Sequence, residues 1–168
     1  MNVTRIWRTA ATTGTAVLAA LALSAGQSAA GERCVEVRGS YVEHAVSGPD
    51  CASPVGLCID GTYRGDIDAT FSGAATSIAT TADTPATTVA QFTSDSTVTG
   101  RVKQWRGALV IKNAGSFATG GDGSIVDLQT IVGGTGRLAG ATGFIRATGT
   151  FTVAGGGRSE YAGTVCLG

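Results

Sequence analysis

The chain has 168 residues, among them 26 glycines; 43% of the residues are hydrophobic, 14% are charged, and the formal net charge is zero. A zero net charge gives no basic surface for phosphates, so we expect no nucleic-acid partner. The hydrophobic content is sufficient to bury a core, which excludes a disordered chain. The glycines lack the three-residue period of collagen. These values predict one globular domain rich in β-structure.

Residues 1–30 have the pattern of a secretory signal peptide. Arg5 and Arg8, with no acidic residue near them, precede an apolar run over 15–25, and small residues stand at Ser28 and Ala30. We therefore expect cleavage between Ala30 and Gly31. The apolar run is shorter than the ~20 residues that span a bilayer, so we expect no membrane segment in the mature form. The predicted product is an extracellular domain, residues 31–168, with a net charge of about −2 once the two arginines are removed.

All four cysteines lie in the expected exported domain: Cys34, Cys51, Cys58 and Cys166. An even number of cysteines in an exported chain predicts two disulfides, and the sequence alone leaves all three connectivities open. Six residues separate the closest pair, and His44 is the chain's single histidine, so the pattern does not fit a zinc site. We expect no metal and no cofactor.

Apolar and polar residues alternate through most of the exported domain. From Ile59 to Gly73, and again from Ala141 to Val153, every second residue is apolar or glycine, as in strands with one buried face. Other strand-like stretches lie at about 34–47, 88–95, 96–105, 108–114, 124–132 and 159–167. The alternation therefore predicts about eight strands.

Turn residues separate these stretches at 47–50, 84–85, 113–115, 120–123 and 155–157, and no stretch has the pattern of an amphipathic helix. Gly61, Gly65 and Gly73 recur on the apolar face of the predicted strand over 59–73, where they allow sharp bends or close approach of neighbouring chain. Long, bent strands favour a single small antiparallel β-barrel over a sandwich.

The glycine-rich segment over 133–143 follows a predicted strand, as the phosphate-binding turn of a dinucleotide fold does. That turn must be followed by a helix, which Gly140 and Gly143 would break. The segment therefore predicts no nucleotide site. Instead, a turn of this composition can cross the end of a barrel, with Leu138 pointing into the lumen as a stopper and Gly143 starting the next strand close to its neighbour.

Residues 127–143 resemble a signature of plant allene oxide cyclases and the related dirigent proteins, Gly-Gly-Thr-Gly-x-Phe-x-Gly-Ala-x-Gly. Leu138 stands in the place of Phe, and the residues that carry the match are Gly133, Gly134, Thr135, Gly136, Leu138 and Gly143. The resemblance implies an eight-stranded barrel, commonly trimeric, with a mostly apolar cavity. The terminal cysteines of dirigent proteins are bridged, which implies Cys34–Cys166 here and leaves Cys51–Cys58. The rival connectivity is Cys34–Cys51 with Cys58–Cys166.

Function must come from side chains that line the lumen. Our first hypothesis is a barrel that binds a small apolar molecule, such as an oxidised lipid, a phenolic or a polyketide. The second is a cyclase-like isomerase that holds such a substrate in one reactive geometry. The third is a structural domain with a closed lumen. A lumen volume under about 100 Å³ would exclude both ligand hypotheses, because drug-sized pockets measure several hundred Å³. The candidate ligand contacts are Tyr63, Phe71, Phe144 and Arg146.

No catalytic residue is assigned from the sequence. Glu43 and His44 are the only acid–imidazole neighbours of the exported domain, but adjacent residues of a strand point to opposite faces. Dirigent proteins often carry an acid directly after the Gly-Gly-Thr-Gly turn, where this chain has Arg137, so their polar site is not carried over.

Overall fold

The computed structural model describes residues 32–83, 88–119 and 123–168. The predicted signal peptide, the predicted turn at 84–85 and residues 120–122 lie outside the described residues.

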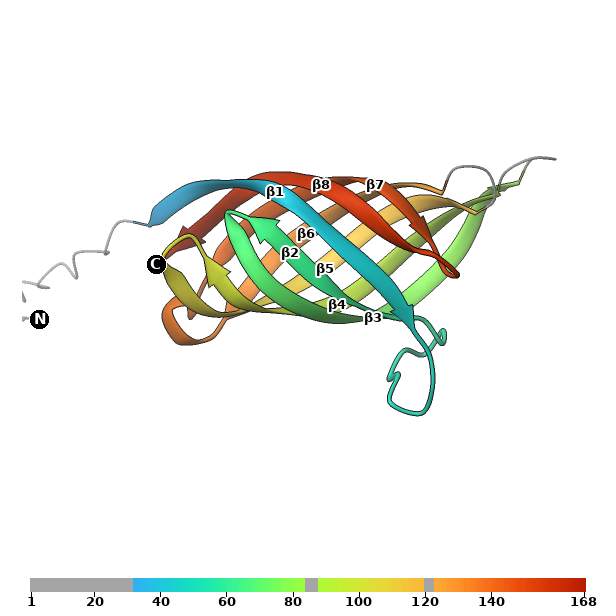
Figure 1. Cartoon of the computed structure of the whole chain (residues 1–168), viewed down its shortest axis with the longest axis horizontal. Coiled ribbons are helices and arrows are strands. Elements are labelled where there is room, and N and C mark those ends of the chain that lie inside the picture. The colour runs from blue at the N-terminus through green and yellow to red at the C-terminus, as the bar shows by residue number, and fades with distance from the viewer. Residues whose placement is uncertain (1–31, 84–87, 120–122) are drawn as a thin grey trace, which may run out of the picture.

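Eight antiparallel strands form a closed barrel, as predicted. Consecutive strands pair, and β1 pairs with β8 (Figure 1). The short η1 helix follows β6, and no helix among the described residues is long and apolar enough to cross a membrane. The strands are β1 (Arg33–Val46), β2 (Cys58–Gly65), β3 (Ile67–Asp83), β4 (Thr88–Val102), β5 (Trp105–Thr119), β6 (Ser124–Gly134), β7 (Thr142–Thr152) and β8 (Gly156–Leu167), and η1 is Gly136–Leu138.

The stretch from 59 to 73, predicted as one strand, is a hairpin of β2 and β3. Tyr63 pairs with Ala69, so the odd-numbered residues of both strands face the lumen and the alternation continues unbroken through the turn. Gly65 supplies the turn, because its φ of 115° is a conformation that other residues rarely adopt. The period of two therefore predicted the buried face correctly and missed the turn.

Two further boundaries differ from the prediction. Residues 88–102 form one strand, where two were expected, and residues 113–115 lie inside β5, where a turn was expected. Gly115 is required there by packing, because a Cβ atom at this position would overlap the carbonyl oxygen of Val126 on β6 and would also lie 2.7 Å from the ring of Phe92. Much of β3 beyond Gly73 was missed, since its run of Ala, Thr and Ser lacks a clear apolar face.

One end of the barrel is closed by the glycine-rich segment, as expected. Leu138 is 1% exposed and belongs to the same buried cluster as Ile67, Val102 and Trp105. Gly143 has a φ of 128°, and a Cβ atom there would overlap the carbonyl oxygen of Thr164 on β8. In Figure 1 this closed end also carries the β2–β3 and β4–β5 turns.

Both predicted disulfides are present. Cys34–Cys166 joins β1 to β8, in which these two residues are register partners. Cys51–Cys58 closes the loop between β1 and β2. Paired cysteines of this kind are typical of proteins that fold in an oxidising compartment.

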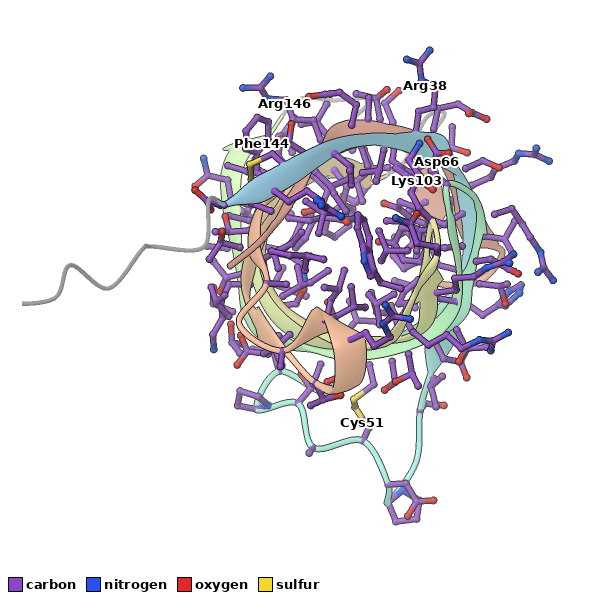
Figure 2. All side chains as sticks on the ribbon, turned by 90° about the vertical axis from the view of Figure 1, so that its left-hand side faces the viewer. Arg38, Cys51, Asp66, Lys103, Phe144 and Arg146 are labelled. Atoms are coloured by element: carbon purple, nitrogen blue, oxygen red, sulfur yellow. A yellow bond between two sulfur atoms is a disulfide. The ribbon has the colours of Figure 1, made fainter. Side chains whose placement is uncertain are left out.

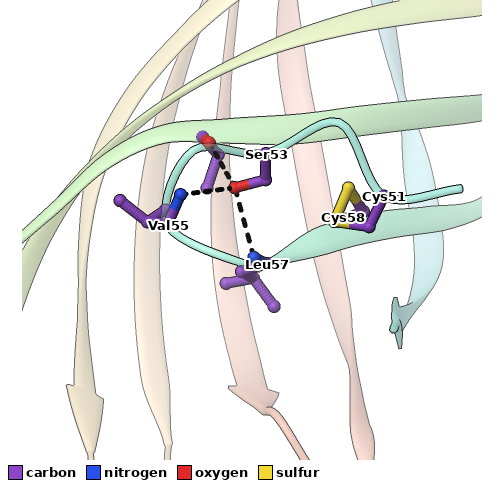
Figure 3. The surroundings of a disulfide bond; sticks show 6 residues. Cys51, Ser53, Val55, Leu57 and Cys58 are labelled. Atoms are coloured by element: carbon purple, nitrogen blue, oxygen red, sulfur yellow. Dashed lines mark hydrogen bonds between the residues drawn. A yellow bond between two sulfur atoms is a disulfide. The ribbon is translucent and has the colours of Figure 1, made fainter. Parts of the chain in front are cut away.

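The loop between β1 and β2 is held by one serine hydroxyl as well as by its disulfide (Figure 3). Ser53 Oγ donates to the carbonyl oxygen of Ala75 on β3 at 2.6 Å and accepts the backbone N–H groups of Val55 and Leu57, each at 3.2 Å. These bonds fasten the loop over β3 and place Leu57 at the inner side of the barrel mouth.

We expect Ser53→Ala to lower the free energy of unfolding by about 1–2 kcal/mol, because three backbone groups would lose their hydrogen bond to this hydroxyl at once. Urea unfolding followed by tryptophan fluorescence measures the change. Ser72→Ala, on the exposed outer face of β3, is the matched control and should stay within about 0.5 kcal/mol of wild type. Equal losses in the two variants would contradict this role for Ser53.

Candidate functional site

The lumen contains a cavity of about 50 Å³ between the closed end and the opposite end of the barrel. Its lining is aliphatic, aromatic and polar, and the aliphatic residues are Leu57, Ile59, Ala75 and Ile125. The aromatic ones are Tyr41, Tyr63, Phe71, Phe92, Phe117 and Phe151, and the polar ones are Glu43, Ser94, Ser96, Asn113, Asp127 and Gln129.

The volume corrects our expectation about ligand size. A cavity needs about 10–15 Å³ to hold one water molecule, so 50 Å³ holds only a few waters. It lies under the limit of about 100 Å³ set above, so both ligand hypotheses are excluded in the form in which they were stated, with a drug-sized molecule in the lumen. A whole lipid, phenolic or polyketide molecule therefore does not fit in the lumen in this conformation.

The acidic lining residues come from β1 and β6, which are not paired with each other. On β1 the side chains of Tyr41 and Glu43 are buried, whereas His44 is exposed on the outside. On β6 the inward row is Ile125, Asp127, Gln129 and Ile131. Glu43 is 4% exposed and Gln129 3% exposed, so these polar groups are inside the barrel.

A short chain of hydrogen bonds orients part of this lining. The hydroxyl of Tyr63 donates to Gln129 Oε1 at 2.8 Å, and Gln129 Nε2 donates to Asp127 Oδ2 at 3.0 Å. On the adjacent strand β5, Asn113, the register partner of Gln129, donates through Nδ2 to Ser94 Oγ at 3.0 Å and to Ser96 Oγ at 2.9 Å. These amides are thereby fixed in place.

Other polar atoms of the lumen have no partner. Within the described part of the chain, Glu43 Oε1 and Asp127 Oδ1 are buried without a hydrogen bond. A buried polar group left unpaired costs about 1–3 kcal/mol, and more when it is charged. Such groups are uncommon in native proteins and call for an explanation.

Burial makes both carboxyl groups weaker acids than usual. It raises the pKa of Glu43 to about 7, and the charge of Asp127 adds to the shift. Burial likewise raises the pKa of Asp127 to about 6, against the opposing effect of the hydrogen bond from Gln129. The pKa of Tyr41 is raised by its own burial and then by the charges of both acids. No lysine, arginine or histidine is among the described lining residues, so ionised acids here have no counter-charge.

The predicted ligand contacts fall on two different faces. Tyr63 and Phe71 line the cavity. Phe144 and Arg146 lie on the outer face of β7, where Phe144 is 40% exposed and the Arg146 guanidinium lies 5.0 Å from the centre of its ring (Figure 2). Phe144 and Arg146 therefore do not line the lumen, because the alternating residues Ile145 and Ala147 take the inward positions.

Sequence reasoning considered Glu43 only beside His44 and missed Asp127, although a signal for both acids was present. Asp127 and Gln129 occupy the row of Ile125 and Ile131, and Glu43 occupies the row of Tyr41. A polar residue in the apolar row of an alternating strand points into the barrel. That pattern in β1 and β6 marks the site.

The comparison with protein families decides which family contains this barrel. The model described as "Protein of unknown function (DUF3224)" matches residues 39–164, about three quarters of the chain. The chain belongs to the DUF3224 family. The matched part includes Glu43 and Asp127, together with the glycine-rich segment at the closed end.

A solved DUF3224 structure is similar in fold. The crystal structure of a protein of unknown function of this family from Shewanella oneidensis MR-1 has a TM-score of 0.50 and 18% sequence identity. The similarity covers 78% of this chain and 97% of that one. No curated protein matches the chain. Neither match names allene oxide cyclases or dirigent proteins, so the resemblance of residues 127–143 to them stays a prediction.

Proposed function

We propose that this DUF3224 protein is an exported barrel that binds one small molecule, or the small end of a larger one, in its lumen. The observation that carries the proposal is the set of buried, unpartnered polar atoms beside a cavity. A ligand that bonds to them would recover part of the cost of burying them. Export is supported by the signal-peptide pattern of residues 1–30 and by the two disulfides.

The ligand would enter at the end opposite the closed one. The aromatic residues on this side contact one another, with ring centres 6.0 Å apart for Phe92 and Phe117 and 6.1 Å apart for Phe117 and Phe151. Figure 1 shows the β1–β2 loop and the β7–β8 turn at this end. Rotation of these rings would widen the cavity toward solvent, and a longer ligand could then leave its tail between them.

A cyclase-like isomerase is the second candidate, and the two buried acids favour it. A carboxyl group with a pKa near neutrality can both donate and accept a proton at physiological pH. The resemblance of residues 127–143 to allene oxide cyclases points to the same class. A reacting group small enough for the cavity would have to lie between Glu43 and Asp127.

Native mass spectrometry of the protein purified from culture medium tests the binding proposal. We expect a bound small molecule on the wild type that Ala75→Leu loses, because Ala75 is buried and lines the cavity. Ala79→Leu, on the exposed outer face of β3, should keep it. A protein that carries no molecule and also shows no response to a library of small fragments in amide NMR spectra would be a closed-lumen domain. A ligand recovered unchanged after incubation would exclude the isomerase for that ligand.

A further inference from the structure

We infer that the lumen selects an organic cation, the ammonium group of an alkylamine, held between the carboxylates of Glu43 and Asp127 against the neighbouring aromatic rings. This inference rests on the proposed function and names the chemical class of its ligand. Three features of the cavity support it: the sign of its charge, the rings that line it, and its size.

The charge of the cavity is of one sign. Glu43 and Asp127 each present an oxygen atom that is buried and has no partner, and Glu43 is 96% buried. Tyr41 and Tyr63 are the other titratable groups that line the cavity, and burial raises the pKa of both, so they stay neutral. Strands β3, β4, β5, β7 and β8 contribute no charged side chain to the described lining. A cationic ligand would supply the missing counter-charge and hydrogen-bond donors.

Three aromatic rings line the same cavity as the two acids and pack on one another. The ring centres of Tyr41 and Tyr63 are 4.9 Å apart, those of Tyr63 and Phe71 5.2 Å, and those of Tyr41 and Phe71 5.8 Å. All three residues line the cavity. The face of an aromatic ring attracts ammonium groups, so the rings that line the cavity would add to the attraction of the two acids.

The size of the cavity and the number of its acids limit the choice of cation. A volume of about 50 Å³ suits a head group with a short alkyl stem. Calcium needs six or more oxygen ligands, of which several are commonly carboxylates. Among the described residues, no third carboxylate or imidazole gathers with Glu43 and Asp127 into a potential metal-binding cluster. An ammonium group needs fewer acceptors and gains from the rings.

An amide NMR titration of the whole exported domain tests the preference for a cation separately from the proposal that the barrel binds a small molecule. The probes are n-butylammonium, the neutral 1-butanol of similar shape, and the anion butyrate, at constant ionic strength near pH 8. We expect butylammonium to shift the amides of β1 and β6 around Glu43 and Asp127 and to bind about tenfold more tightly than butanol. Butyrate should not bind.

The affinity should also follow the ionisation of the two acids. Butylammonium keeps its charge below about pH 10, as lysine does, whereas Glu43 and Asp127 become neutral below their pKa values of about 7 and 6. Binding should therefore weaken at least about tenfold between pH 8 and pH 5. Glu43→Gln and Asp127→Asn should each weaken it by a similar factor at pH 8. Glu36→Gln, on the exposed face of β1, should not.

The possible results have distinct meanings. If butanol binds as tightly as butylammonium, or calcium ions bind in its place, the inference is wrong and the proposal of a binding barrel stands. An affinity for butylammonium that is unchanged by pH and by both substitutions would also overturn it. If none of the probes binds and no molecule accompanies the purified protein, the binding proposal fails as well.

Discussion

Removing the Cys34–Cys166 disulfide should lower the free energy of unfolding by roughly 5 kcal/mol, the largest effect we expect from one change in this barrel. The two cysteines are 132 residues apart in sequence and pair across β1 and β8. A cross-link stabilises a fold mainly by restricting the unfolded chain, and the restriction grows with the length of the loop that it closes. The double variant Cys34→Ala/Cys166→Ala, unfolded in urea under non-reducing conditions, measures the loss.

The second disulfide provides the matched control. Cys51 and Cys58 are only 7 residues apart, so Cys51→Ala/Cys58→Ala should cost roughly 2 kcal/mol by the same relation. We also expect the first variant to unfold with a larger dependence on urea, since its unfolded chain is no longer cross-linked and exposes more surface. Equal losses in the two double variants would show that native packing around the sulfurs outweighs the length of the closed loop.

Replacing Glu43 by glutamine should make the ligand-free protein more stable at pH 8. The pKa of Glu43 is 4.5 in the unfolded chain and about 7 in the folded barrel, so the folded state binds more protons between these values. Stability therefore falls as the pH rises through this window, by roughly 3 kcal/mol for a shift of this size. Glutamine keeps the shape of the side chain and cannot ionise, which removes this loss.

The measurement is the free energy of unfolding at pH 5 and at pH 8. We expect the wild type to be several kcal/mol less stable at pH 8 than at pH 5, because Asp127 adds to the effect of Glu43. Folding raises the pKa of Asp127 from 3.8 to about 6, so its ionisation also lowers the free energy of unfolding as the pH rises. Glu43→Gln should show about half of this dependence. Glu36→Gln, whose side chain is exposed, should show all of it. A wild type whose stability is flat between the two pH values would refute the assignment of raised pKa values to the lumen acids.

The alternation of side chains predicted most of the fold. It identified the buried faces of β2, of β3 as far as Gly73, and of β7, and the glycine-rich segment predicted that Leu138 closes one end. The alternation did not reveal the turn between β2 and β3. Because Tyr63 pairs with Ala69, the odd-numbered residues face the lumen on both sides of the turn. The turn becomes visible only in the backbone angle of Gly65, which the sequence does not give.

The candidate site was less accessible from the sequence. Tyr63 and Phe71 were placed correctly in the lumen, while Phe144 and Arg146 were chosen by residue type although their parity puts them outside. The acids Glu43 and Asp127 were overlooked as a pair because 84 positions separate them and no motif links them. Only the closure of the barrel brings β1 and β6 around one cavity, and that closure depends on three-dimensional packing.

The order of strands in the barrel also has a consequence for how fast it folds. Each strand pairs with the next along the chain, so most of the sheet can assemble from hairpins with short loops. The pairing of β1 with β8 is the exception, since its partners are more than a hundred residues apart. Contacts of such separation are slow to form because the entropy of closing the loop is lost first. A chain that keeps Cys34–Cys166 during denaturation has already lost that entropy, so it should refold faster than the reduced chain, and barrel closure should be the step that limits the reduced one.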